Sequence, residues 1–196
     1  MLYIEGYFLD MQEEITADER DSGFSLVELA TVLAIGAILM AISIPMVSGA
    51  MRSWQLAADA RNIANTLASA KLSASAQMTH YRLSINLGGS TWKLEKYNRT
   101  SSAYEIQGAT NQLSSGLANS DIAFKSASSA APAGFPTDSS TAITFSSRGI
   151  PIDGAGVPTP ANVVYLSGGG TDYAVTVSLT GKVQLWKYRS SQWISQ

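Results

Sequence analysis

Cysteine is absent from the 196 residues, and histidine occurs once, at His80. Without cysteine the chain has no disulfide, no thiolate metal site and no cysteine nucleophile. Charged side chains make up only 14% of the residues. The acidic side chains after residue 23 are scattered, with neither a carboxylate pair nor metal-ligand spacing. The sequence therefore predicts no enzyme, no catalytic residue, no metal, no cofactor and no small-molecule substrate, and His80 is expected to be structural or exposed.

Acidic residues are concentrated at the N-terminus. Residues 1–23 contain seven acidic side chains and one basic side chain, Arg20. Without this segment, 12 basic and 8 acidic side chains remain, so the rest of the chain carries +4 while the whole chain carries −2. If residues 1–23 are removed, the remaining protein is mildly basic.

A run without any charged residue extends from Leu29 to Met51. As an α-helix with a rise of about 1.5 Å per residue, this run reaches about 35 Å, enough to cross a hydrocarbon core of about 30 Å. A buried core helix seldom runs so long without a polar face. The run therefore predicts a membrane-spanning helix.

A short motif stands directly before this run, Gly-Phe-Ser-Leu-Val-Glu-Leu at residues 23–29. A secretory signal would place its small-residue cleavage site after the apolar run. The arrangement of Gly23, Phe24 and Glu28 resembles the type IV prepilin family, which includes the pseudopilins of type II secretion. The resemblance implies that a prepilin peptidase cuts between Gly23 and Phe24 and that the new amine of Phe24 is methylated.

The positions of Glu28 and Pro45 match the family when they are counted from Phe24. Glu28 is the fifth mature residue, and the family's partner for this carboxylate is the α-amine of a neighbouring subunit's Phe24 during filament assembly. The alternative is that Glu28 lies among the lipid headgroups. Pro45 is the 22nd mature residue; it removes a backbone donor and crowds the carbonyl of Ala41, so a helix kink is expected.

The leader departs from the family pattern, in which leaders are typically short and basic. Only Arg20 precedes the span, and Arg52 and Arg61 follow it, so the positive-inside rule specifies the orientation weakly. Translation from Met11 in place of Met1 would shorten the leader, and the sequence leaves both starts open.

After Met51 the sequence becomes amphipathic. An apolar stripe with spacings of three or four residues predicts that the helix continues to about residue 79 and packs on a sheet. The stripe consists of Leu56, Ala60, Ile63, Leu67, Ala70, Ala74 and Met78. The other faces are expected to carry Asp59, Arg61, Asn65, Lys71 and Gln77.

From His80 onward the apolar pattern has a period of two. Alternation predicts a hairpin of His80–Leu87 and Thr91–Tyr97, turned at Gly88-Gly89. Residues 98–119 and Ser126–Ser140 are predicted to be irregular. Further strands are predicted at Asp121–Lys125, Ala142–Ser146 and Asn162–Leu166, with a final hairpin of Tyr173–Leu179 and Val183–Tyr188 turned by Thr180-Gly181-Lys182. A turn is also predicted at Gly168-Gly169-Gly170.

Residues in the C-terminal half limit the resemblance to one branch of the family. Ile143-Thr144-Phe145-Ser146-Ser147-Arg148-Gly149, followed by the hairpin with Leu-Thr-Gly-Lys at its turn, resembles the GspH/FimT branch of minor pilins and pseudopilins. The implied fold is α+β: a long N-terminal helix, membrane-spanning in its first half, packed against an antiparallel β-sheet domain in a pilin-like lollipop. The expected parts are a cleaved leader (1–23), a transmembrane and filament-core helix (24–52), an amphipathic helix half (53–79) and a periplasmic β domain (80–196).

The resemblance implies a structural role for the protein. It indicates a GspH-like minor pseudopilin, anchored in the bacterial inner membrane with its C-terminal domain in the periplasm. Its expected partners are prepilin peptidase and the other pseudopilins of a filament that supports protein secretion. The alternative is a FimT-like type IV minor pilin that serves pilus assembly or DNA binding and uptake.

The nucleic-acid alternative depends on a basic segment near the C-terminus. Some FimT-type pilins bind DNA through a Gly-Arg-x-Arg turn, and the corresponding residues 181–184 here are Gly-Lys-Val-Gln. Lys182, Lys187 and Arg189, interleaved with aromatic residues, are the candidate DNA contacts. The favoured interpretation is an ordinary strand with solvated charges and core aromatics.

Overall fold

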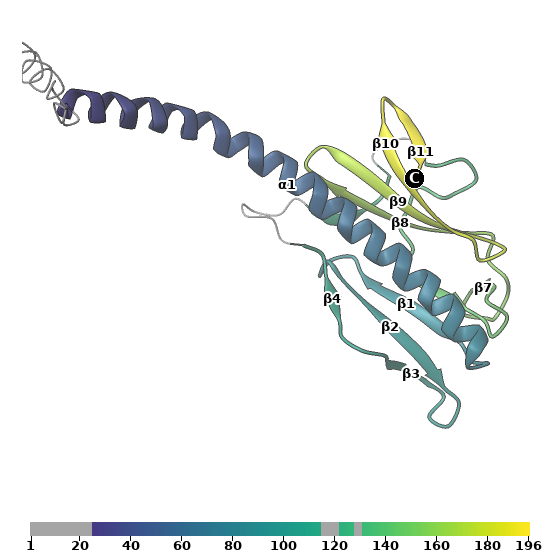
Figure 1. The fold of residues 1–196 in the computed structure, drawn as a ribbon. Helices are drawn as coiled ribbons and strands as arrows, with labels where there is room; N and C mark the ends of the chain where they lie inside the picture. Colours follow the sequence, from purple (N-terminus) through teal and green to yellow (C-terminus); the bar gives the residue numbers. More distant parts are fainter. Residues whose placement is uncertain (1–24, 115–121, 128–130) are drawn as a thin grey trace, which may run out of the picture. The chain divides into compact units, whose positions relative to one another are not determined.

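The computed structural model describes residues 25–114, 122–127 and 131–196. Residues 1–23 and the Gly23–Phe24 bond therefore lie outside the described residues. Helix α1 (Leu26–Ala76) is followed by strands β1 to β11 (Figure 1). The chain divides into two compact units, Met1–Ile44 and Pro45–Gln196. The predicted α+β class is confirmed.

The described part of the first unit is the apolar beginning of α1. Ser25 caps the helix: its side-chain oxygen accepts a hydrogen bond from the Val27 amide (3.3 Å), and its carbonyl accepts one from the Leu29 amide (3.0 Å). Leu26–Ser43 has a mean hydropathy of 2.3 and is long and apolar enough to cross a membrane. None of the residues from Leu26 to Ser43 is buried against the described part of the chain.

In the second unit, α1 packs through the predicted stripe. Its first six members, from Leu56 to Ala74, are completely buried. The prediction for the seventh member, Met78, is wrong. Its side chain is 66% exposed, because α1 ends at Ala76 and Met78 turns the chain with a φ of 50°. Asp59, expected on another face, is buried as well and has partners described below.

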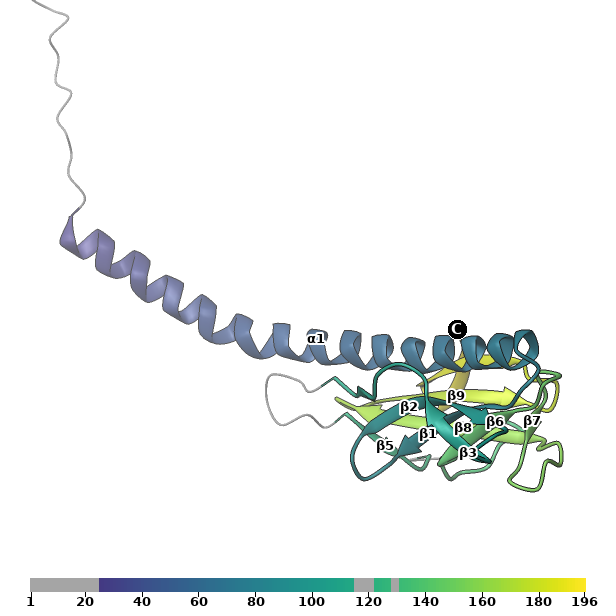
Figure 2. The same ribbon diagram turned by 90° about the horizontal axis from the view of Figure 1, so that it is seen from below.

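Two antiparallel sheets lie under this part of the helix (Figure 2). The first has the order β3-β2-β1-β6-β7, with β4 also beside β2. Its strands are β1 (Tyr81–Asn86), β2 (Thr91–Asn98), β3 (Ala103–Ile106), β4 (Asn111–Gln112), β6 (Ala142–Phe145) and β7 (Pro151–Ile152). The second has the order β11-β10-β9-β8-β5, made of β5 (Ala123–Lys125), β8 (Ala161–Gly168), β9 (Thr171–Ser178), β10 (Val183–Arg189) and β11 (Gln192–Ser195).

The helix and both sheets share one apolar core. Alternate residues of β1 (Tyr81, Leu83 and Ile85) face it from the first sheet, as a period of two requires. Val164 and Val175 face it from the second sheet. A smaller cluster around Val163, Tyr165 and Ala174 buries the opposite face of β8 and β9, where Trp186 and Trp193 pack against it. Strands β8 and β9 are therefore apolar on both faces.

Most predicted strands are present within a few residues of their expected bounds, including the first hairpin and the β9–β10 hairpin. The predicted irregularity of residues 98–119 is wrong, because β3 and β4 pair with β2 there. The β9–β10 hairpin is not the last element either, because β11 pairs with β10 after a tight turn. Ser190 and Ser191 make that turn with φ values of 51° and 63°. Hairpin turns with a positive φ at both central residues usually have the sequence Asn-Gly.

Candidate assembly site

The first candidate surface is the apolar span itself. Ten large apolar side chains between Leu26 and Ile42 are each more than half exposed. A contiguous apolar surface of this size marks contact with a membrane or with another protein. The two hydroxyls here bond to the helix backbone, Thr31 to the Glu28 carbonyl and Ser43 to the Leu39 carbonyl, each at 2.8 Å. The described span therefore offers lipid or partner helices an apolar surface whose hydroxyls are already paired.

Glu28 is the one charged residue between Phe24 and Met51. It lies exposed in the first turn of α1, where a negative charge complements the positive end of the helix dipole. The structure thus places a single carboxylate at the beginning of the span. Gly23 and Phe24 lie outside the described residues. Pro45 lies within α1 as the first residue of the second unit, and the kink there stays a prediction.

In the second unit, two glycine turns meet beside α1. Lys71 of α1 donates hydrogen bonds from Nζ to the carbonyls of Gly181 (2.9 Å) and Thr180 (3.4 Å) in the β9–β10 turn. A Cβ on Gly149 would lie 3.0 Å from Ser75 Oγ, and both glycines have positive φ. The Phe-x-x-x-Gly segment and the Leu-Thr-Gly-Lys turn, recognised separately in the sequence, therefore form one contact with the helix.

Asp59 joins the helix to the segment after β4. Its two carboxylate oxygens accept hydrogen bonds from the Ser114 amide (2.8 Å) and the Ser114 hydroxyl (2.9 Å). Burial raises the pKa of Asp59, and the two bonds from Ser114 oppose that increase. No local sequence pattern indicates this pairing, because the two residues are 55 positions apart.

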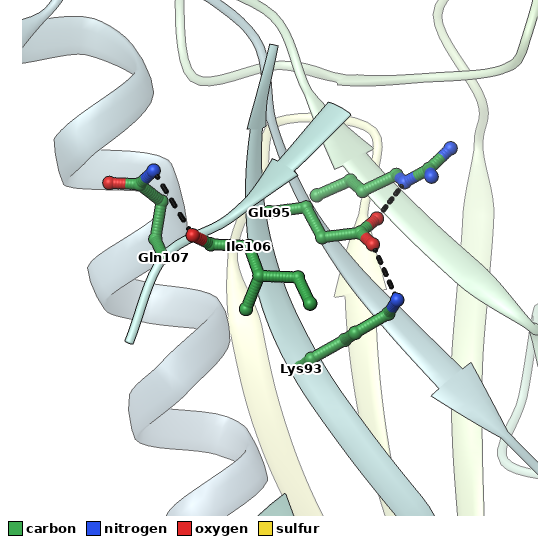
Figure 3. Close-up of polar contacts among 5 residues, drawn as sticks. Lys93, Glu95, Ile106 and Gln107 are labelled. Carbon is green, nitrogen blue, oxygen red and sulfur yellow. Dashed lines mark hydrogen bonds and ion pairs between the residues drawn. The ribbon is translucent and has the colours of Figure 1, made fainter. Parts of the chain in front are cut away.

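A charged cluster lies on the outer face of the first sheet. Glu95 of β2 accepts a hydrogen bond from Arg82 Nε (2.5 Å) and lies 2.9 Å from Lys93 Nζ (Figure 3). The Arg82 guanidinium carbon lies 3.8 Å from the centre of the Tyr104 ring. Burial alone would raise the pKa of Glu95, but the hydrogen bonds and charges of Lys93 and Arg82 hold it below its ordinary value. With two cations and one carboxylate, the cluster keeps one net positive charge.

The three candidate DNA contacts do not form one patch. Lys182 precedes β10 and Arg189 ends it, so their backbones lie about 23 Å apart at about 3.3 Å per residue. Lys187 lies opposite Tyr173, with its Nζ 5.6 Å from the centre of that ring. The intervening aromatic side chains point to the other face of the strand.

Those aromatic side chains are also engaged in packing. Trp186 donates its indole N–H to Thr176 Oγ1 (2.9 Å), and the rings of Tyr188 and Trp193 lie 5.1 Å apart. The described C-terminal strands therefore do not combine a base-stacking surface with the basic side chains.

His80 is half-buried between α1 and β1, and its ring centre lies 5.8 Å from that of Tyr97. Among the described residues, no group of three His, Cys, Asp or Glu side chains is arranged to hold a metal ion.

Two family models match the chain. The Prokaryotic N-terminal methylation motif matches residues 20–44, and Type II transport protein GspH matches residues 59–181. No curated protein sequence matches significantly.

Two solved structures illustrate the similarity. The minor pseudopilin EpsH from the type 2 secretion system of Vibrio cholerae is 13% identical, covering 67% of this chain and 95% of that chain, with a TM-score of 0.46. The type IV minor pilin FimU of Pseudomonas aeruginosa (strain PAO1) is 16% identical, covering 71% and 92%, with a TM-score of 0.47.

The GspH match spans more than half of the chain and contains Asp59, Lys71, Glu95, Gly149 and Gly181, the residues that organise the second unit. The methylation motif begins before Gly23 and ends at Ile44, the last residue of the first unit. The resemblance found in the sequence is confirmed on both counts. The chain belongs to the Type II transport protein GspH family.

Proposed function

We propose that this protein is a GspH-like minor pseudopilin, a structural subunit of a filament that supports type II protein secretion. The observation that carries the proposal is the apolar span from Leu26 to Ser43, of which no residue is buried, and which has one carboxylate, Glu28, in its first turn and a prepilin motif before it. Such a helix needs a hydrocarbon environment or a bundle of similar helices. Membrane anchoring followed by filament assembly provides each in turn.

Processing prepares the helix for assembly. Cleavage after Gly23 removes a segment with seven acidic side chains and a net side-chain charge of −6, and it leaves a free amine on Phe24. Methylation of that amine keeps its positive charge. The mature protein then begins with a cation four residues before Glu28.

Glu28 is proposed to select its neighbour by charge. An unpaired carboxylate at the edge of an apolar bundle is costly. A protonated amine at about 4 Å, in a medium of effective dielectric constant about 20, attracts it with a Coulomb energy of about 4 kcal/mol. The family resemblance assigns this pairing to two different subunits, so the Phe24 amine of a neighbouring subunit is proposed as the partner. This pairing fixes the axial register of adjacent subunits.

The remaining parts follow from the same proposal. Residues 24–52 anchor the protein in the inner membrane and later form the filament core, and Pro45 kinks the helix. Residues 53–79 carry the amphipathic half, and residues 80–196 form the β domain on the periplasmic side. No catalytic step is assigned to any of them.

The proposal is tested by following processing and assembly in cells that contain the secretion system. Gly23→Ala should leave the chain unprocessed, visible as a slower-migrating species and as a missing N-methyl-Phe24 peptide by mass spectrometry. Glu28→Gln should be processed but should fail to crosslink to other subunits. Glu105→Gln, a matched exposed change on β3, should be processed and should crosslink normally. Normal processing and assembly of Gly23→Ala would contradict the proposal.

The same cells can be used to distinguish a type II secretion filament from a type IV pilus. In-cell crosslinking followed by identification of the partners should recover secretion-pathway pseudopilins. Recovery of competence or twitching pilins instead would favour the FimT-like minor pilin. The separation of Lys182 from Lys187 and Arg189 weighs against DNA uptake as the role of this domain.

A further inference from the structure

Trp54 is the most exposed of the four tryptophans. It is 73% exposed, whereas Trp92 is 3% exposed and Trp186 and Trp193 are half-buried. Trp54 lies on α1, three residues after Met51, the last residue of the charge-free run. An indole ring is mainly apolar and carries one polar N–H, so it suits a boundary between an apolar and an aqueous phase.

Trp54 is the last large apolar residue of an exposed stripe on α1. Val47 and Met51 precede it on the same helix face, at spacings of four and three residues, and both are exposed. Ala58 and Arg61 follow it on that face and are exposed as well. The face therefore changes from apolar to charged within two turns after Trp54. A surface for a partner helix would continue along α1, whereas a lipid bilayer ends at one level.

The position of Trp54 along the helix matches the headgroup layer of a bilayer. Trp54 lies three residues beyond Met51, which is about 4.5 Å along the helix axis. A hydrocarbon core is about 30 Å thick and the whole bilayer about 40–45 Å, so each headgroup layer is roughly 5–7 Å thick. Tryptophan is enriched at this level in membrane proteins.

Arg52 provides a positive charge at the same level. It is the first charged residue after the span, and it forms no ion pair with another described residue. A guanidinium group fits the oxygens of a phosphate with two parallel hydrogen bonds. The exposed β8–β9 turn lies beside Arg52, because a Cβ on Gly169 would be 3.6 Å from the Arg52 Cβ. Gly169 and Gly170 add neither a side chain nor a charge there, so the turn leaves room for a headgroup.

We propose that Trp54 and Arg52 bind phospholipid headgroups at the membrane surface from which the second unit projects, and that this contact fixes the depth of the span in the bilayer. The inference rests on the proposed function, because it describes the membrane-anchored stage before assembly. The Trp54 ring contacts the upper acyl chains, and its N–H donates to an ester or phosphate oxygen. The Arg52 guanidinium donates to a phosphate.

The experiment measures the depth of Trp54 by fluorescence quenching. The full-length chain is reconstituted into phosphatidylethanolamine–phosphatidylglycerol vesicles at a low ratio of protein to lipid, and flotation of the vesicles establishes insertion. The emission of Trp54 is the difference between this chain and Trp54→Phe. Lipids brominated near the headgroup end of their acyl chains should quench it strongly, and iodide in the water should quench it weakly. Trp54→Phe should unfold at the same temperature as the parent chain, because the ring is exposed.

The matched control moves the indole along the same helix face. In the double variant Trp54→Phe, Leu72→Trp, the ring lies 18 residues further on, which is five full turns and about 27 Å further from the span. Leu72 is 70% exposed, so the new ring should lie in water. Iodide should quench it strongly, and brominated lipids should not.

The role of Arg52 is tested separately. Arg52→Gln should lower the ratio of lipid-exposed to water-exposed Trp54 about fivefold, the equivalent of about 1 kcal/mol for one basic residue at an anionic membrane surface. Arg61→Gln is the control, since Arg61 is exposed and lies nine residues further along α1. It should leave the ratio unchanged.

Three results would overturn the inference. Iodide quenching of Trp54 as strong as that at position 72 would place the ring in water. Protection of Trp54 from both quenchers would show that protein covers it, as in a contact between copies of this chain. Equal effects of Arg52→Gln and Arg61→Gln would exclude Arg52 from the contact. Failure of the chain to float with the vesicles would instead contradict the membrane anchoring on which the proposed function depends.

Discussion

Gly181 lies directly against the backbone of Gly149: a Cβ built on Gly181 would lie 2.3 Å from the Gly149 carbonyl oxygen. The β9–β10 turn and the turn after β6 therefore touch through their main chains, without side chains between them. The contact is one reason why the β9–β10 turn requires glycine, whereas a Cβ on Gly149 would meet Ser75 and Lys71 of α1. Both glycines also have a positive φ.

Gly181→Ala should destabilise the second unit by about 2–4 kcal/mol, from left-handed backbone strain plus the displacement of the Gly149 carbonyl. Chemical denaturation of the detergent-solubilised chain measures the effect. Gly156→Ala is the control, because Gly156 also has a positive φ but a Cβ there would meet no atom within 4 Å. An equal loss of stability in both variants would show that strain alone, and not the contact, requires Gly181.

Lys71→Met should lower stability by about 1.5–3 kcal/mol, the usual contribution of a hydrogen bond from a charged group. The substitution keeps most of the aliphatic length but removes the donor to the Gly181 and Thr180 carbonyls. Arg61→Met, at an exposed position of the same helix, serves as the comparison. Unfolding midpoints of the two variants that coincide with that of the parent chain would contradict this role for Lys71.

Asp59 should make stability fall as pH rises. Its pKa in the folded protein is raised above the ordinary 3.8 by burial, so the folded state binds its proton more tightly than the unfolded state does. The contribution is complete below pH 3.8 and is lost as the pH rises through the raised pKa. Asp59→Asn can keep both contacts with Ser114, so its stability relative to the parent should increase over that window in pH-dependent unfolding.

Glu95 should act in the opposite sense. Its pKa is lowered, so its contribution is present above the ordinary value of 4.5 and is lost as the pH falls through the lowered pKa. Glu95→Gln should remove this acid sensitivity and leave Arg82 and Lys93 without their counter-charge. Unfolding curves of the two single variants over the same pH range should diverge in opposite directions from the parent, and parallel curves would contradict both assignments.

DNA binding by the full chain should be weak and insensitive to Lys182→Ala. The three basic residues are spread along β10, and the aromatic rings beside them are packed on the other face of the strand. A salt-sensitive mobility shift with double-stranded DNA that Lys182→Ala abolishes would reverse this expectation.

The sequence was most informative where one physical signal acts locally. The stripe from Leu56 to Ala74 is a helical period, and the alternation in β1 and β2 is a strand period, so both elements were predictable. Met78 continues the helical spacing although it follows the end of α1. Periodicity carries no information on where the backbone turns, so it could not predict this helix end. Strand β3 was missed because Tyr104 is half-buried and its neighbours are exposed, which leaves no apolar alternation.

The polar contacts were the least predictable part of the molecule. Asp59 resembles a solvated residue until Ser114 is placed beside it, and Lys71 resembles one until the β9–β10 turn reaches it. Trp92 is an apolar core residue by pattern, and only the structure shows that its indole N–H has no partner among the described residues. The motif at Gly23–Glu28 was recognisable because its residues are contiguous in the sequence, so identifying it needs no folded context.

The bond from Lys71 to Gly181 joins residues 110 positions apart. During synthesis, α1 is complete long before its acceptor carbonyl has been made, and the same is true of the β8 and β9 side chains that cover its apolar stripe. Contacts of such long range form slowly, and a helix waiting for them exposes surface that aggregates. In this chain the second sheet can cover the stripe only after β8 and β9 have been made, so part of the stripe stays uncovered during most of translation.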